Sequence, residues 1–209
     1  MSRYLMTHSL LSSWLYAIKE NPYEQGGGDG KEEKQTAFDS FLQTLNRVRT
    51  EPNEHMQKGI DFENLVTDII QGRPGAAEHK WYQPASKAAA IIGGGLLQHR
   101  AQKEIEVRGI TLLLYGRIDA LKAGVVYDTK FSGSYEVGKY LDNTQHPMYL
   151  EIIPQATRFE YLVSNGSHFW PEVYTREETP SIIPIISQFL DWLDLQNLMG
   201  VYKEKWLAK

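Results

Sequence analysis

The spacing of apolar residues along the chain changes from a helical to a strand period and back again. In the first 92 residues, apolar positions recur every three or four residues, as in amphipathic helices. The predicted helices cover the segment up to Lys19, residues 37–49, 54–71 and 84–92. After Gly93-Gly94-Gly95, the pattern predicts strands near 103–108, 110–119 and 124–131. The remaining predicted elements are a helix at 145–153, strands at 158–164 and 168–175, and helices from about 181 to 206.

Turn residues divide these elements and set the expected architecture. The stretch 21–35 combines Pro, glycines and charges without apolar periodicity, so we expect a mobile loop there. Asn165-Gly166 is typical of a hairpin between the last two strands. The three central strands are expected to form an antiparallel meander. The order of elements predicts an α/β (mixed α+β) fold, with helices around one central mixed sheet.

Length and composition narrow the classes of protein. A chain of 209 residues with 42% hydrophobic content can form one compact domain. No apolar run is long enough to span a membrane and no signal peptide begins the chain, so we expect a soluble, cytoplasmic protein without a membrane partner. The absence of cysteine excludes disulfides, thiolate nucleophiles and cysteine-bound metal clusters. The net charge of −4 means that any contact with nucleic acid requires a local basic groove.

Charged residues interrupt the two central strands where apolar residues are expected. Side chains alternate along a strand, so Asp128 and Lys130 point to one face. If the strands form a hairpin, Asp119 lies near Asp128, and two close carboxylates need a positive partner. A hard divalent cation suits them, and Lys130 could then orient water and offset charge on a phosphate. The alternative is an ordinary ion pair between Asp128 and Lys130.

A third carboxylate lies on the helix predicted at 54–71. A helical projection places Glu63 within the broad apolar side of that helix, and an inward carboxylate needs a cation. That apolar side consists of Met56, Ile60, Phe62, Leu65, Val66, Ile69 and Ile70. Alternatively, Glu63 borders the core and pairs with a Lys or Arg. Gln145 and Tyr149, four positions apart, share one face of the later helix and could reach the same site.

Four motifs in this order resemble those of one nuclease superfamily. Gly59-x-x-Phe62-Glu63, Gly116-x-x-Asp119, Asp128-x-Lys130 and Gln145-x-x-x-Tyr149 resemble the PD-(D/E)XK superfamily, and most closely its RecB-type and phage lambda-exonuclease-like branch. The resemblance covers roughly residues 54–164 and implies a restriction-endonuclease-like core. Residues 1–53 would add N-terminal helices, and residues 165–209 a strand and C-terminal helices.

The resemblance also implies an activity and roles for individual residues. Glu63, Asp119 and Asp128, with the backbone carbonyl of Thr129, would bind Mg²⁺ or Mn²⁺. Lys130 would act in catalysis, and Gln145 and Tyr149 would position the lysine and the substrate. The expected function is hydrolysis of DNA phosphodiester bonds by a phage or prophage exonuclease in recombination or repair.

Further residues are candidates for contact with DNA. Arg117 shares a strand face with Asp119, and Lys139 adds positive charge. Small Ser132 could admit a phosphate and Tyr135 could stack on a base, although an ordinary turn explains this segment equally well. Two other functions stay open: an endonuclease of the same fold, or an inactive module that binds DNA or a single-strand annealing protein. The apolar C-terminal segment is expected to pack as a helix and could contact a second copy of the chain.

Overall fold

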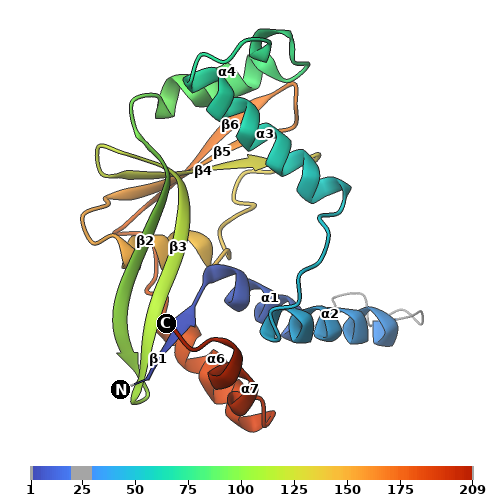
Figure 1. Cartoon of the computed structure of the whole chain (residues 1–209), viewed down its shortest axis with the longest axis vertical. Coiled ribbons are helices and arrows are strands. Elements are labelled where there is room, and N and C mark those ends of the chain that lie inside the picture. Colours follow the sequence, from blue (N-terminus) through green and yellow to red (C-terminus); the bar gives the residue numbers. More distant parts are fainter. Residues whose placement is uncertain (1, 20–29, 209) are drawn as a thin grey trace. The chain divides into compact units, whose positions relative to one another are not determined.

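The protein is described by a computed structural model that covers residues 2–19 and 30–208 (Figure 1). Its helices are α1 (His8–Ile18), α2 (Gly30–Leu45), α3 (Glu54–Ile70), the short 3₁₀ helix η1 (Ala76–Glu78), α4 (Tyr82–Ile92), α5 (Gln145–Ile152), α6 (Ile183–Leu195) and α7 (Met199–Lys205). Its strands are β1 (Arg3–Met6), β2 (Leu96–Val107), β3 (Ile110–Lys122), β4 (Val125–Phe131), β5 (Arg158–Ser164) and β6 (Phe169–Thr175).

The strands form a mixed sheet, which confirms the predicted fold class. The strand order is β1-β3-β4-β5-β6, and β2 pairs with β3. The β3–β4 and β5–β6 pairs are antiparallel, whereas β1–β3 and β4–β5 are parallel. The parallel β4–β5 connection runs through α5, as parallel pairing requires a long crossover.

The chain divides into two compact units. One contains Met1–Thr50, Gln102–Tyr115 and Ser181–Lys209, and the other contains Glu51–Ala101 and Gly116–Pro180. We call them the terminal unit and the central unit. Strands β2 and β3 contribute residues to both. All the predicted site residues belong to the central unit.

Two tight turns fix the registers of the hairpins. Arg108 and Gly109 have φ of 54° and 71°, and Ala123 and Gly124 have φ of 50° and 76°. Positive φ at both central residues is typical of two-residue hairpin turns, whose twist matches that of the strands. The Ala123-Gly124 turn therefore sets which residues of β3 and β4 face one another.

Two helices begin at residues whose side chains cap them. The Thr7 side chain accepts a hydrogen bond from the Leu10 amide, and the Asn53 side chain accepts one from the Met56 amide, so α1 and α3 both have N-caps. Within α3, however, Met56 and Ile60 are exposed, whereas Phe62, Leu65 and Val66 are buried. The apolar side predicted for this helix is therefore buried only in its second half.

Three predicted boundaries or assignments were wrong. The predicted loop at 21–35 extends too far, because α2 begins at Gly30; residues 21–29 lie outside the described residues. The segment rich in Lys, Glu and Gln that follows Gly30 consists of good helix formers. Strand β1 was missed because four residues are too few to show alternation. Strand β2 begins at Leu96, directly after the glycines, rather than near 103.

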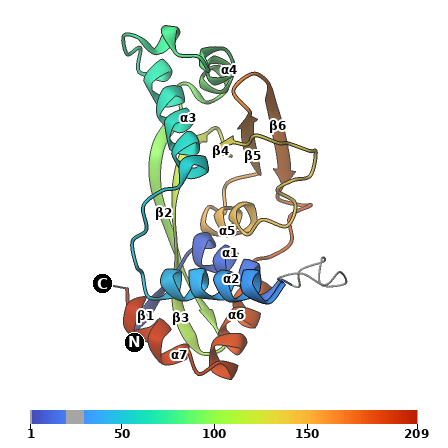
Figure 2. The same ribbon diagram turned by 90° about the vertical axis from the view of Figure 1, so that its right-hand side faces the viewer.

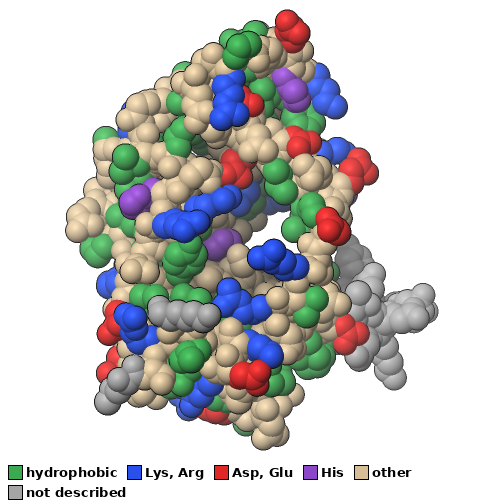
Figure 3. Space-filling view, in the orientation of Figure 1, with side chains coloured by type: hydrophobic (Ala, Val, Ile, Leu, Met, Phe, Trp, Pro, Cys, Tyr) green, Lys and Arg blue, Asp and Glu red, His purple; other side chains and the backbone are tan. Residues whose placement is uncertain are grey.

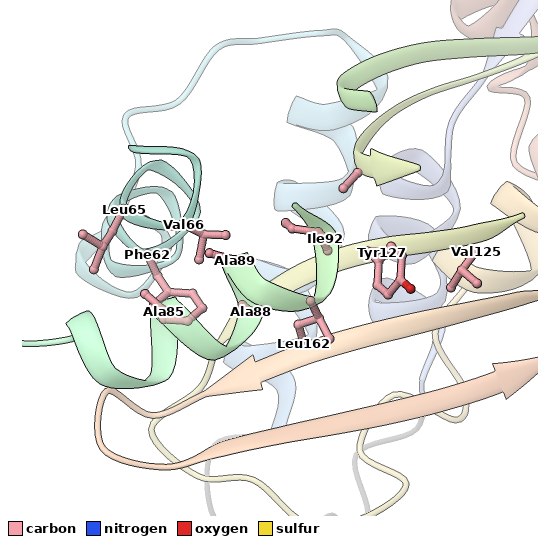
Figure 4. Close-up of a cluster of buried hydrophobic side chains, with 11 residues drawn as sticks. Phe62, Leu65, Val66, Ala85, Ala88, Ala89, Ile92, Val125, Tyr127 and Leu162 are labelled. Atoms are coloured by element: carbon pink, nitrogen blue, oxygen red, sulfur yellow. The ribbon is translucent and has the colours of Figure 1, made fainter. Parts of the chain in front are cut away.

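The central unit has helices on both faces of its sheet (Figures 1 and 2). On one face, α3 and α4 pack through Phe62, Val66, Ala85 and Ala89 against Tyr127 of β4 and other sheet residues (Figure 4). On the other face, α5 packs through ring contacts of His146 and Tyr149 with Phe159 of β5. Because side chains alternate along a strand, Asp128 and Tyr161 point to the α5 face.

The terminal unit has a separate core rich in aromatic residues. Trp14 of α1 lies 5.4 Å from Phe189 of α6 between ring centroids, and Phe41 of α2 lies 5.2 Å from Trp192. The Tyr202 hydroxyl donates to the Leu5 carbonyl oxygen at 2.9 Å. The C-terminal segment therefore packs as predicted. None of the helices in the described ranges is both long and apolar enough to cross a bilayer.

Candidate active site

The two strand carboxylates face each other at the end of the β3–β4 ladder. Ala120 pairs with Tyr127, Leu121 with Val126 and Lys122 with Val125. Continuing this antiparallel register by one step places Asp119 opposite Asp128, where the backbone pairing has ended. Directly opposite side chains share a face of the sheet. The turn at Ala123-Gly124 therefore brings two residues nine positions apart to one place.

Asp119 occupies the position where the ladder opens. Its Oδ2 accepts hydrogen bonds from the Thr129 amide at 2.9 Å and from the Thr129 hydroxyl at 3.1 Å. The carboxylate thus replaces the strand carbonyl as the acceptor for this amide. Burial raises the pKa of Asp119 well above its usual range, and the charges of Asp128 and Glu63 raise it further. The Thr129 amide and Lys130 act in the opposite direction.

Asp128 is buried, and its two carboxylate oxygens contact an ammonium group and a side-chain amide. The Lys130 ammonium lies 2.7 Å from Asp128 Oδ2, and the Gln145 side-chain amide donates to Asp128 Oδ1. Lys130 itself stays partly accessible, with 28% of its side chain exposed. The structure therefore brings Asp128, Lys130 and Gln145 together, as their spacing predicts. The ion pair between Asp128 and Lys130 is present, and its aspartate is buried whereas its lysine is partly exposed.

Glu63 approaches from α3 and has its own partners. The Gln98 side-chain amide donates to Glu63 Oε1, and Arg117 Nη2 lies 3.9 Å from the same oxygen. Gln98 has φ of 51°, a left-handed conformation that non-glycine residues seldom adopt. This strained residue within β2 was not predicted, because no residue pattern marks it.

Tyr149 packs against a glycine in β3. A Cβ atom at Gly116 would lie 2.0 Å from Cε1 of the Tyr149 ring, so only glycine fits. The Tyr149 hydroxyl donates to the Arg117 carbonyl oxygen at 3.0 Å. Burial and the charges of Asp128 and Asp119 raise the pKa of Tyr149. The glycine of the Gly116-x-x-Asp119 motif therefore allows α5 to approach the strand that carries the acid.

The other candidates for DNA contact lie in the segment that follows β4. Lys139 is exposed, and its ammonium donates to Ser132 Oγ at 2.7 Å and to the Ser134 carbonyl oxygen. The Tyr135 hydroxyl donates to Glu172 Oε2 at 2.6 Å. The Tyr135 ring stacks on Trp170, with 5.0 Å between centroids. This segment is therefore fixed to β6 rather than being a simple turn.

Sequence reasoning missed Glu172, a buried carboxylate of β6. Besides the Tyr135 hydroxyl, it accepts hydrogen bonds from the Tyr174 hydroxyl and, at 3.1 Å, from the Tyr140 amide. Tyr140 in turn stacks on Tyr161, with 4.5 Å between centroids. The only signal in the sequence is a Glu at an inward position of a strand, which is meaningful only once its long-range donors are known.

The fit of a divalent cation depends on how the acidic side chains are arranged. Among residues 2–19 and 30–208, no group of three or more His, Asp and Glu side chains is gathered in a ligand geometry. The donors to Asp119 and to Glu63 lie on one oxygen of each carboxylate, Oδ2 and Oε1, whereas both oxygens of Asp128 have a protein partner. Their oxygen donors suit Mg²⁺ or Mn²⁺. In the described part of the chain, the buried amide oxygens of Gln98 and Gln145 accept no hydrogen bond, which leaves further oxygen donors beside the acids.

Acidic and basic side chains are both exposed on one face of the molecule. Lys, Arg, Asp and Glu side chains are interspersed on the face drawn in Figure 3. This agrees with the net charge of −4. Positive charge at the acids comes from Lys130 beside Asp128 and from Arg117 beside Glu63, whereas Lys139 lies beside Ser132.

Comparison with known proteins supports the fold alone. No family model and no curated protein matches the sequence. A solved structure described as "Crystal structure of SSO0001" has a similar fold, with a TM-score of 0.54 and 15% sequence identity. The alignment covers 94% of this chain and 79% of that chain. At this identity, the similarity says nothing about shared chemistry.

Proposed function

We propose that this chain is a divalent-metal-dependent DNA nuclease of the PD-(D/E)XK type. The observation that carries the proposal is the pairing of Asp119 and Asp128 across the open end of a hairpin, with Lys130 on Asp128. Two carboxylates at one place repel each other, which is costly in a stable fold unless a cation is bound there. Such unfavourable arrangements of titratable groups are typical of functional sites.

The proposed ligands of the ion are Asp119, Asp128 and Glu63, with the backbone carbonyl of Thr129 as the fourth protein group. A bound Mg²⁺ or Mn²⁺ ion would supply Lewis-acid polarisation of a phosphodiester and activation of a water molecule. Gln145 fixes the orientation of Asp128 through the hydrogen bond to Oδ1. Gln98 does the same for Glu63.

Lys130 lies where it could orient the attacking water or stabilise negative charge on the phosphate. Its ammonium is held by Asp128 on one side and is partly open to solvent on the other. A phosphate that approaches Asp128 would therefore meet this ammonium, which would offset the negative charge that builds up during in-line attack. Tyr149 fixes the β3 backbone beside the site through its hydrogen bond to the Arg117 carbonyl oxygen.

DNA is the proposed substrate, and recombination or repair of phage or host DNA is the proposed setting. This role would place the protein in the cytoplasm of a bacterial host, with a single-strand annealing protein as its proposed partner. Arg117, with 59% of its side chain exposed, and Lys139 would bind phosphates near the site. We propose the exonuclease mode first, as the resemblance implies, and the endonuclease mode as its alternative.

The proposal is tested by degradation of end-labelled linear DNA and of closed circular DNA with Mg²⁺ or Mn²⁺. Wild type should degrade DNA only with metal, and Asp128→Ala and Lys130→Ala should both lose activity. Degradation of linear but not circular DNA indicates an exonuclease, and cutting of circles indicates an endonuclease. If wild type cleaves no DNA form with either metal, the nuclease proposal is wrong and the inactive DNA-binding module takes its place.

A further inference from the structure

Three aromatic side chains form a row beside the proposed active site. Tyr135 and Trp170 stack with 5.0 Å between centroids and 28° between planes. His168 and Trp170 stack with 5.6 Å between centroids and 21° between planes. We call Tyr135, Trp170 and His168 the aromatic row. Trp170, the middle ring, is covered by its two neighbours, whereas the outer ring of His168 is exposed, so a ligand reaches the row at its end.

The aromatic row lies on the same face of the sheet as Asp128 and Lys130. Lys130 of β4 is opposite Val163 of β5, and Val163 is opposite Trp170 of β6. Opposite residues in neighbouring strands point to the same face, and adjacent strands are roughly 4.8 Å apart. The backbone of Trp170 therefore lies roughly 10 Å from the backbone of Lys130 across the sheet. This distance is spanned by one or two nucleotides.

Glu172 and the rings beside it fix the aromatic row in place. Tyr161 is opposite Asp128 in one direction and Glu172 in the other. The buried Glu172 carboxylate accepts the hydroxyl of Tyr135, so the ring of Tyr135 is oriented before any ligand binds. A preorganised ring loses little entropy on binding. The same carboxylate also accepts hydrogen bonds from the Tyr174 hydroxyl and the Tyr140 amide, so it holds the segment that carries Tyr135 against β6.

We propose that the aromatic row binds unpaired bases of single-stranded DNA and directs the strand to Lys130. This inference rests on the proposed function. In a duplex, both faces of each base are covered by neighbouring pairs, so a flat side chain can stack only on an unpaired base. Phosphates of the same strand would be neutralised by Lys139, whose ammonium lies beside Ser132 in the segment that carries Tyr135. A basic side chain next to stacked rings is the usual arrangement for binding a single strand.

The choice of a single strand is supported by the remaining surface of this segment. Val137 and Leu141 are 92% and 66% exposed, so the segment presents apolar as well as basic side chains. Apolar and aromatic groups suit base faces, whereas a duplex presents mainly phosphates to a protein.

The test is binding of fluorescein-labelled DNA in EDTA, where cleavage cannot occur. The probes are a dT 20-mer, a 20-mer of the same length made of abasic sites, and a 20-base-pair duplex. Trp170→Ala removes the ring that supports both outer rings and should weaken binding of the dT 20-mer by roughly 5- to 150-fold, the range for one stacked base. Binding of the abasic strand should not change, and Trp170→Phe should restore most of the affinity for dT.

Each result decides between the proposals. The inference is wrong if Trp170→Ala binds the dT 20-mer as wild type does, if it loses the abasic and duplex probes equally, or if wild type binds the duplex in preference to the single strand. Because the assay needs no catalysis, base-dependent binding without any nuclease activity would support the aromatic row while overturning the proposed function. Normal nuclease activity of wild type together with unchanged binding by Trp170→Ala would support the proposed function and overturn the role of the aromatic row.

Discussion

The ring of Tyr149 occupies the space that a side chain at Gly116 would need. A Cβ at position 116 would lie 2.0 Å from Tyr149 Cε1 and 2.8 Å from Cζ. Through this contact, α5 lies close enough to β3 for the Tyr149 hydroxyl to reach the Arg117 carbonyl. The same helix carries Gln145 to Asp128. Glycine at position 116 therefore controls the distance between the helix and both carboxylates.

Gly116→Ala should consequently displace α5. We expect a loss of about 1–3 kcal/mol in the free energy of unfolding, the usual result of overpacking, together with reduced nuclease activity. Urea denaturation and the DNA degradation assay measure the two effects. Gly133→Ala is the matched control, because a Cβ at Gly133 meets nothing within 4 Å. Equal stability of Gly116→Ala and Gly133→Ala would show that the close contact does not position the helix.

Asp119→Asn should stabilise the protein when metal is absent. The folded state raises the pKa of Asp119, so stability from this residue is full at low pH and is lost as the pH rises through the raised value. Asparagine removes the charge but can still accept the hydrogen bonds from Thr129. In EDTA at pH 8 we expect the Tm to rise by roughly 2–4 °C, as about 1 kcal/mol produces in a chain of this size.

Bound metal should make wild type more stable than Asp119→Asn, the reverse of their order in EDTA. Added Mn²⁺ should raise the Tm of wild type, because a ligand that binds only the folded state stabilises it, and should raise that of Asp119→Asn less. Asp61→Asn on the exposed side of α3 serves as the control and should behave as wild type. A lower Tm for Asp119→Asn in EDTA, or an equal response to Mn²⁺, would speak against a strained metal site.

His146 should make the fold sensitive to acid. Burial lowers the pKa of His146 from 6.5 to about 4, and the charge of Glu172 opposes this effect. Because the unfolded chain binds the proton first, the stability that His146 contributes is full above pH 6.5 and falls as the pH drops toward 4. The loss over this window is about 3 kcal/mol.

Replacement of His146 should remove this dependence. Urea denaturation between pH 4.5 and 7 should show a shallower decline for His146→Gln than for wild type. His99→Gln, which changes an exposed histidine, should leave the decline unchanged. Identical pH profiles for wild type and His146→Gln would contradict a neutral, buried imidazole in this position.

Local patterns were sufficient to predict the parts of the site that depend on strand alternation and a short turn. Asp128 and Lys130 share a face because side chains alternate, and Ala123-Gly124 sets the register that brings Asp119 opposite Asp128. The helical spacing of Gln145 and Tyr149 likewise determines that both face the strands. In these cases, few residues separate the partners, so the geometry is nearly fixed by the sequence.

Other features depend on contacts between distant segments and could not be predicted. Gln98 meets Glu63 only because β2 adopts a left-handed conformation at one residue, for which the sequence has no glycine or asparagine as a marker. Two of the three donors to Glu172, Tyr135 and Tyr140, come from a segment more than thirty residues earlier. The exposed Met56 and Ile60 also show that an apolar helix side indicates burial only where a neighbour covers it.

The most direct test of the proposed chemistry is the single-turnover rate of cleavage of a labelled DNA strand in Mg²⁺ by Lys130→Met. Methionine keeps the length of the side chain but removes the ammonium beside Asp128. Lys58→Met, which changes a lysine paired with Glu54 on the surface of α3, is the control. We predict a rate lower by roughly 10²–10⁴-fold for Lys130→Met and an unchanged rate for Lys58→Met. Cleavage by Lys130→Met at the wild-type rate would contradict a catalytic role for this lysine.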